Sequence, residues 1–158
     1  MRWSLPPPSG CALRPSTPES RWVVTLADEV VPVLADPDRW AQVVTNLVGN
    51  AVRATDAGGR IDVRVTAAAG TAVCEVSDTG VGLDAADVVA VFERFYRVPG
   101  RRESTGSGSG IGLTIARELV RAHGGELAAS SPGPGRGATF TARMPLADGA
   151  GTAEAPTP

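Results

Sequence analysis

The stretch TNLVGNAVRAT, residues 45–55, most constrains how this chain folds. Its apolar residues recur by threes and fours and predict an amphipathic helix: Leu47, Val48, Ala51 and Val52. Asn46 and Asn50 lie four apart on a second stripe, with Arg53 one turn beyond Asn50. Asparagine is unfavourable inside a helix, because its amide competes for backbone hydrogen bonds. Two asparagines on one face therefore indicate either solvated surface residues or a binding site.

Composition limits the possible functions. The formal net charge of −2 leaves no electrostatic footprint for nucleic acid or an acidic membrane. The only histidine is His123, which excludes most zinc-site and Ser-His-Asp interpretations. The two cysteines, Cys11 and Cys74, form no disulfide framework or metal cluster. We therefore expect no nucleic-acid partner and no cysteine-based site.

The ends of the chain differ from its middle in composition. Residues 1–20 are rich in Pro and Ser and predict a disordered leader, and residues 148–158 predict a disordered tail. The leader has three prolines where a signal peptide needs an apolar segment. No apolar run approaches the roughly 18 residues that span a bilayer. We expect one domain at residues 21–147 that is cytoplasmic, reduced and not inserted into a membrane, with membrane association through a partner as the alternative.

Helix and strand patterns alternate along this domain. We expect strands at 22–26 and 30–34, a helix that begins after Asp36, and a hairpin that turns near Gly70. A short helix in AADVVAVFERFYRV, an amphipathic helix in IGLTIARELVRAHGG, and the strands ELAAS and ATFTARMP follow. Because the strands form hairpins and not repeated βαβ units, we predict an α/β (α+β) sandwich. Its sheet is mixed and largely antiparallel, with helices on one face.

Two glycine-rich stretches are candidate phosphate-binding loops: DTGVG at 78–82 and GSGSGIG at 106–112. The second opens a helix, so its free N–H groups can meet an anion; the alternative is a flexible linker. A Walker A loop is excluded, because the chain has no lysine. A Rossmann fingerprint is also excluded, because glycines at 106, 108, 110 and 112 have the wrong spacing.

Asp78 stands where a strand runs into the first glycine stretch. A carboxylate there can accept a hydrogen bond from an exocyclic amine, the group that separates adenine from guanine; the alternative is a turn-forming Asp. The amide oxygen of Asn50 or Asn46 is a neutral hard ligand that suits Mg²⁺. Arg53, on the same helix, can neutralise phosphate charge.

These stretches together resemble the catalytic ATPase domain of histidine kinases. QVVTNLVGNAVRAT is similar to its N box, VSDTGVGLD to its G1 box, VFERFYR to its F box, and GSGSGIGLTIARELVRAHGG to its G2 box. SSPGPGRGATFTARMPL resembles its last hairpin, and the match spans roughly residues 21–146. The resemblance implies the Bergerat fold, shared with gyrase, mismatch-repair and heat-shock-chaperone ATPases, with a mobile ATP lid.

The resemblance implies ATP and Mg²⁺ as cofactors. Asn50 is the implied Mg²⁺ ligand, with Asn46 nearby and Arg53 facing the phosphates. Arg101 or Arg102 is implied to reach the γ-phosphate. At the other end of the nucleotide, Asp78 is implied to bind the adenine amino group, and the backbone is implied to approach the base.

Further nucleotide-binding positions follow from the same resemblance. Gly80 and Gly82 let the backbone approach the base, and Thr139 lies near the adenine. Phe92, Phe95 and Tyr96 are implied to anchor the lid. The remaining implied nucleotide-binding positions surround it: Phe95, Tyr96, Gly108, Gly110, Ile111, Gly112 and Leu113. The three lid glycines act as hinges and present N–H groups to the phosphates.

The sequence departs from the family pattern at two points. Ala54 stands where the family often has an aromatic residue that stacks on adenine, so we expect an affinity loss of around 1 kcal/mol. The phosphoacceptor hairpin is also missing, and His123 lies where the family carries a histidine, for which we expect a structural role. The implied partners are a phosphoacceptor/dimerisation domain, on its own kinase or a separate chain, and then a response regulator.

Position 46 separates the possible reactions. The superfamily's hydrolases and its anti-sigma-type serine kinases carry a glutamate there, because a water or serine must lose a proton as it attacks. A neutral imidazole needs no such base. Asn46 therefore indicates γ-phosphate transfer to a histidine on a separate domain or chain. A degenerate nucleotide-sensing binding module and a serine kinase of the anti-sigma type remain as alternatives.

Overall fold

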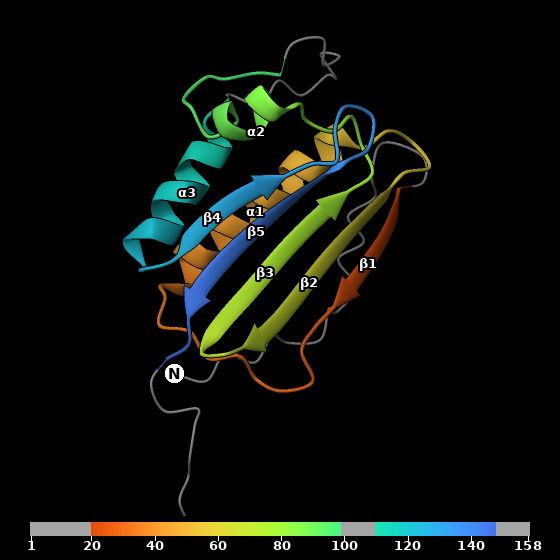
Figure 1. Ribbon diagram of the computed structural model, residues 1–158. Coiled ribbons are helices and arrows are strands. Elements are labelled where there is room, and N and C mark those ends of the chain that lie inside the picture. Colours follow the sequence, from red (N-terminus) through yellow and green to blue (C-terminus); the bar gives the residue numbers. More distant parts are fainter. Residues whose placement is uncertain (1–19, 99–109, 148–158) are drawn as a thin grey trace, which may run out of the picture.

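In the part of the chain that the structure describes, five strands form one mixed sheet, and the two longer helices pack against one of its faces (Figure 1). This computed structural model describes residues 20–98 and 110–147. The strands, in the sheet order β1-β2-β3-β5-β4, are β1 (Arg21–Thr25), β2 (Arg60–Ala68), β3 (Thr71–Asp78), β5 (Ala138–Pro145) and β4 (Glu126–Ser130). β1 is parallel to β2, and the other neighbouring pairs are antiparallel. The predicted sandwich is confirmed.

The helices are α1 (Pro37–Ala54), α2 (Ala85–Ala90) and α3 (Gly112–Ala122). α1 begins where the sequence predicted, because Oδ1 of Asp36 accepts hydrogen bonds from the N–H groups of Asp38 and Arg39 at 2.9 and 3.1 Å. In the described part of the chain, none of the helices is both long enough and apolar enough to cross a lipid bilayer. Residues 1–19 of the predicted leader, residues 99–109 of the predicted lid and the predicted tail at 148–158 fall outside the described residues.

The hydrophobic core lies between the sheet and the helices α1 and α3. Leu47 of α1 and Val120 of α3 are fully buried against Ile61, Val76 and Phe140 of the sheet. Complete burial of a side chain such as Leu47 stabilises the fold by about 1.5–3 kcal/mol. This core fixes α1 and α3 relative to the strand ends.

His123 joins the end of α3 to the start of α1. Its Nε2 accepts the N–H of Asp36 at 3.2 Å, so Nδ1 holds the proton and donates to the carbonyl of Leu119 at 2.7 Å. The histidine thus connects the two core helices through backbone atoms on both sides. The expected structural role of His123 is confirmed.

The predicted strand at 30–34 is wrong. This segment forms only an isolated bridge between Val33 and Leu146. Val30 and Leu34 are 75% and 84% exposed, and Pro32, which has no N–H group, cannot donate to a strand ladder. The neighbouring strand β1 is present, one residue earlier than predicted.

The hairpin of β2 and β3 turns through two residues, Ala69 and Gly70. Both have positive φ values, 50° and 76°, as a type I′ turn requires. Gly70 adopts this backbone readily, whereas the Cβ of Ala69 makes a positive φ unfavourable. The hairpin therefore holds a small, local backbone strain at Ala69.

We expect Ala69→Asn to stabilise the protein by about 0.5–1 kcal/mol, because Asn tolerates a positive φ at this turn position. Urea unfolding monitored by circular dichroism measures the change. Ala68→Asn, one residue earlier in β2, is the control and should not stabilise. An Ala69→Asn protein no more stable than wild type would contradict this assignment of the turn.

Candidate functional site

The polar stripe predicted on α1 is present and partly buried. Asn50 is 9% exposed, Asn46 is half-buried, and Arg53 is exposed. A Cβ on Gly49 would lie 3.3 Å from Nη1 of Arg53, so the arginine folds back along the stripe. Nδ2 of Asn46 is buried and has no hydrogen-bond acceptor within the described residues. Such a donor is costly unless a ligand supplies an acceptor.

The N-terminus of α3 lies beside this stripe. α3 begins at Gly112, and its N-cap residue, Ile111, makes no side-chain capping bond. A Cβ on Gly112 would stand 3.3 Å from Oδ1 of Asn46, so the two helices approach closely there. The first N–H groups of α3 and the positive end of its dipole thus lie next to Asn46, an arrangement that favours an anion.

Asp78, the last residue of β3, is 6% exposed, and the loop that follows it contacts the C-terminal end of α1. Its Oδ1 accepts the N–H of Gly80 at 2.9 Å, which shapes the loop of residues 79–83, here called the Asp78 loop. The N–H of Val81 donates to the carbonyl of Ala54 at 3.1 Å. A Cβ on Gly80 would lie 2.0 Å from that same carbonyl oxygen, so only glycine permits this contact with α1.

The turn between β4 and β5, residues 131–137, packs on the opposite side of the Asp78 loop. Gly135 and Gly137 donate their N–H groups to the carbonyls of Val81 and Gly80 at 2.7 and 3.0 Å. Gly82 has φ 66°, and a Cβ there would lie 2.2 Å from the carbonyl oxygen of Gly133. Gly80 and Gly82 therefore let the Asp78 loop contact α1 and the β4–β5 turn closely, whereas their predicted approach to a base stays a prediction.

Phe92 and Tyr96 fix the segment after α2. Phe92 is 5% exposed and packs edge-on against Phe140, with ring centroids 6.2 Å apart. Its carbonyl accepts the hydroxyl of Thr114 at 2.9 Å, which connects it to α3. The hydroxyl of Tyr96 donates to Oδ1 of Asp87 at 2.6 Å. These contacts are consistent with the anchoring role predicted for both residues.

The side chain of Phe95 does not anchor this segment. It is 72% exposed, and its backbone has a positive φ of 63°. The N–H of Phe95 donates to the carbonyl of Gly110 at 3.0 Å, and a Cβ on Gly110 would lie 2.9 Å from Cα of Phe95. Phe95 therefore contributes its backbone, and the positive φ turns its side chain outward. Gly110 must be glycine for the two backbones to meet.

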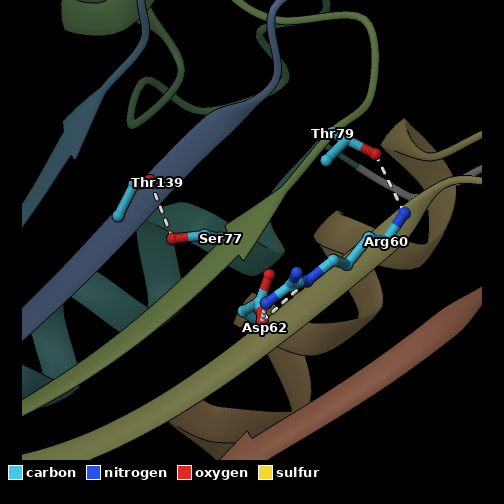
Figure 2. Close-up of polar contacts among 5 residues, drawn as sticks. All are labelled: Arg60, Asp62, Ser77, Thr79 and Thr139. Carbon is cyan, nitrogen blue, oxygen red and sulfur yellow. Dashed lines mark hydrogen bonds and ion pairs between the residues drawn. The ribbon is translucent and has the colours of Figure 1, made fainter.

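Thr139 does not lie with the other predicted site residues. Strand alternation places it on the outer face of the sheet, away from α1 and α3, where its hydroxyl bonds to that of Ser77 at 2.8 Å (Figure 2). Asp78 pairs instead with Ala138, which is buried. The alternation of apolar and polar residues along ATFTARMP could have revealed this.

The remaining predicted positions divide into two groups. Arg101, Arg102 and Gly108 lie outside the described residues. Ile111 and Leu113 flank the start of α3 and are half-buried, and the side chain of Leu113 packs against the hydrophobic core. The side chain of Leu113 thus fixes the N-terminus of α3 by packing, and its backbone forms part of the first turn of that helix.

A family model described as histidine kinase-, DNA gyrase B-, and HSP90-like ATPase matches residues 35–148. The chain belongs to this ATPase family. It is 40% identical over 127 residues to the sensor protein TorS of Escherichia coli, an alignment that covers 80% of this chain and 13% of TorS. The chain therefore corresponds to a small part of that relative.

Solved structures of histidine kinases have the same fold. The mycobacterial sensor histidine kinase MprB superposes with a TM-score of 0.67 at 30% identity, covering 80% of this chain and 81% of that one. Full-length ShkA in complex with AMPPNP superposes with a TM-score of 0.68 at 30% identity, covering 80% of this chain and 26% of ShkA. This ATPase domain is thus of the type found in sensor histidine kinases.

Tyr96 is the only tyrosine, so its ionisation can be followed directly by absorbance near 295 nm. The hydrogen bond to Asp87, together with burial and nearby carboxylates, raises the pKa of Tyr96 to about 12. We expect a titration midpoint near that value in the folded ATPase domain and near 10 in urea. Because the folded pKa is the higher one, the contact stabilises the fold below about pH 10, and this stabilisation is lost as the pH rises toward 12.

Asp87→Ala should move the folded midpoint back toward 10, because it removes the acceptor of the hydrogen bond. Glu93→Gln is the matched control: it removes a carboxylate that makes a smaller contribution to the pKa of Tyr96. An equal midpoint in wild type and Asp87→Ala would contradict the contact between Tyr96 and Asp87.

Proposed function

We propose that this ATPase domain binds Mg·ATP along α1 and transfers the γ-phosphate to a histidine on a phosphoacceptor/dimerisation domain. The observation that supports this most is the arrangement of one helix face. Its C-terminal end, at Ala54, contacts the Asp78 loop, and Asn46 meets the N-terminus of α3. These residues are eight positions apart, about 12 Å along the helix. An extended nucleotide has a comparable span from its base to its terminal phosphates.

The base end of the site is the Asp78 loop. The Asp78 carboxylate is almost completely buried on the helix side of the sheet, where it can accept a hydrogen bond from the adenine amino group. Gly80 and Gly82 let α1 and the β4–β5 turn pack closely on the Asp78 loop, which fixes the backbone beside this carboxylate. A carboxylate accepts hydrogen bonds and cannot donate them, so this end favours adenine over guanine.

The phosphate end combines several donors. The uncapped N–H groups of α3, Nδ2 of Asn46 and the guanidinium of Arg53 all favour negatively charged oxygens. The amide oxygen of Asn50, on the same stripe, is a suitable ligand for Mg²⁺, which accepts few protein ligands and retains waters and phosphate oxygens. When bound, Mg²⁺ neutralises phosphate charge. The residues present therefore fit the ion that the family implies.

The residue at position 46 indicates which acceptor is used. An amide cannot take a proton from an attacking water or serine, whereas a neutral histidine attacks with its own lone pair. Catalysis by this chain therefore consists of positioning and charge neutralisation by Asn46, Arg53 and the α3 amides. We propose that a phosphoacceptor domain, on the same kinase or a separate chain, supplies the histidine in the cytoplasm and that a response regulator then receives the phosphoryl group.

We expect Asp78→Asn to weaken ATP binding about tenfold or more, because one acceptor becomes a donor that faces the amino group. Titration with a fluorescent ATP analogue measures the affinity. Asp62→Asn is the matched control, because Asp62 pairs with Arg60 on the outer face of the sheet (Figure 2). Equal affinities in Asp78→Asn and wild type would contradict adenine recognition by Asp78.

Transfer can be tested with [γ-³²P]ATP, Mg²⁺ and a purified phosphoacceptor hairpin from a histidine kinase. We expect acid-labile label on the hairpin, its loss with Asn50→Ala, and slow ATP hydrolysis when the hairpin is omitted. Acid-stable label would indicate a serine kinase of the anti-sigma type. Absence of Mg²⁺-dependent ATP binding would indicate a degenerate nucleotide-sensing module, and rapid hydrolysis without a partner would contradict the role given to Asn46.

A further inference from the structure

Ser131 directly follows β4, and its hydroxyl makes hydrogen bonds with three residues. Oγ donates to the carbonyl of Gly137 at 2.6 Å, with the carbonyl of Gly133 as a second acceptor at 3.3 Å, and it accepts the N–H groups of Gly133 and Leu83 at 3.1 and 3.0 Å. A serine hydroxyl offers one proton and two lone pairs, so these contacts use its full capacity. Two of the three residues lie within the β4–β5 turn, and the third lies in the Asp78 loop.

The Ser131 hydroxyl bridges a glycine-rich turn. This turn contains three glycines with positive φ values: Gly133 at 127°, Gly135 at 75° and Gly137 at 74°. Pro132 and Pro134 fix their own φ angles, but glycine loses more conformational freedom on folding than any other residue, so the three glycine positions need further contacts. The Ser131 hydroxyl links Gly133 to Gly137 across the turn and thereby holds Gly135 between them.

The turn in turn supports the Asp78 loop. Gly135 and Gly137 donate to Val81 and Gly80, and Ser131 binds the N–H of Leu83, whose side chain is 5% exposed. The same loop is held at its start by the bond from Gly80 to Asp78. If the hydroxyl were removed, the N–H of Leu83 would lose its partner and the loop would be less well fixed.

We propose that Ser131 is a positioning residue for nucleobase recognition, acting through the Asp78 loop and without touching the nucleotide. This inference rests on the proposed nucleotide site. Its distinguishing consequence is local: loss of the hydroxyl loosens residues 79–83 and 131–137 and weakens the contact with the adenine amino group, while the phosphate end of α1 and α3 is unchanged.

The test compares wild type with Ser131→Ala in binding ADP and inosine diphosphate, whose base has an oxygen where adenine has the amino group. We expect Ser131→Ala to weaken ADP binding about tenfold and to reduce the preference for ADP over inosine diphosphate. Backbone amide exchange should become faster in residues 79–83 and remain unchanged in β2 and α3. Ser77→Ala is the matched control, because it removes an inter-strand hydroxyl bond on the outer face.

Ser131→Cys is a milder variant that keeps the size of the side chain but hydrogen-bonds weakly, so we expect an intermediate effect. If Ser131→Ala does not fold, Ser131→Cys tests the positioning role in its place. A merely structural role would lower both affinities equally and speed exchange throughout the sheet, and either result overturns the inference. An unchanged ADP affinity in both variants also overturns it. If wild type itself does not bind ADP, the proposed function fails instead.

Discussion

The contact between the last turn of α1 and the Asp78 loop is the constraint on which the site depends. Carbonyls at the end of a helix lack partners within the helix, and the carbonyl of Ala54 is satisfied by the N–H of Val81. The contact is possible because residue 80 is glycine, since a Cβ there would lie 2.0 Å from the same oxygen. This hydrogen bond thus joins the helix layer to the end of the central strand β3 and helps to set where Asp78 lies relative to Asn50.

Features that are unfavourable for folding alone lie along the same face of α1, N-terminal to this contact. Asn46 buries an amide N–H without an acceptor in the described structure, α3 begins without a side-chain cap, and Asn50 is nearly buried in the middle of a helix. Each departs from the usual pattern of an interior helix face. Their position along one side of α1 supports the proposed nucleotide site, because a bound anion would satisfy the N–H groups of Asn46 and of the first turn of α3.

The sequence predicted the elements that depend on local pattern. The α1 stripe followed from a period of 3.6, and Asp78 followed from a strand that runs into glycine. Thr139 was misplaced because its role was taken from the family resemblance, although the period of two in ATFTARMP puts it on the face opposite Ala138 and Phe140. The exposure of Phe95 had no signal in the sequence, because it depends on a positive φ that is fixed by pairing with Gly110. Ser131 was missed because its partner Leu83 is 48 residues away.

The residue at position 54 explains why a rigid Asp78 loop matters to this chain. Stacking on an aromatic ring tolerates small changes in the position of a base, whereas a hydrogen bond weakens steeply when its angle or length changes. Ala54 offers no ring, and its carbonyl is already bonded to Val81. On the proposed function, adenine recognition therefore depends on Asp78 and the glycine backbone, which are directional contacts. Their strength is set by how firmly α1 on one side and the β4–β5 turn on the other hold the Asp78 loop.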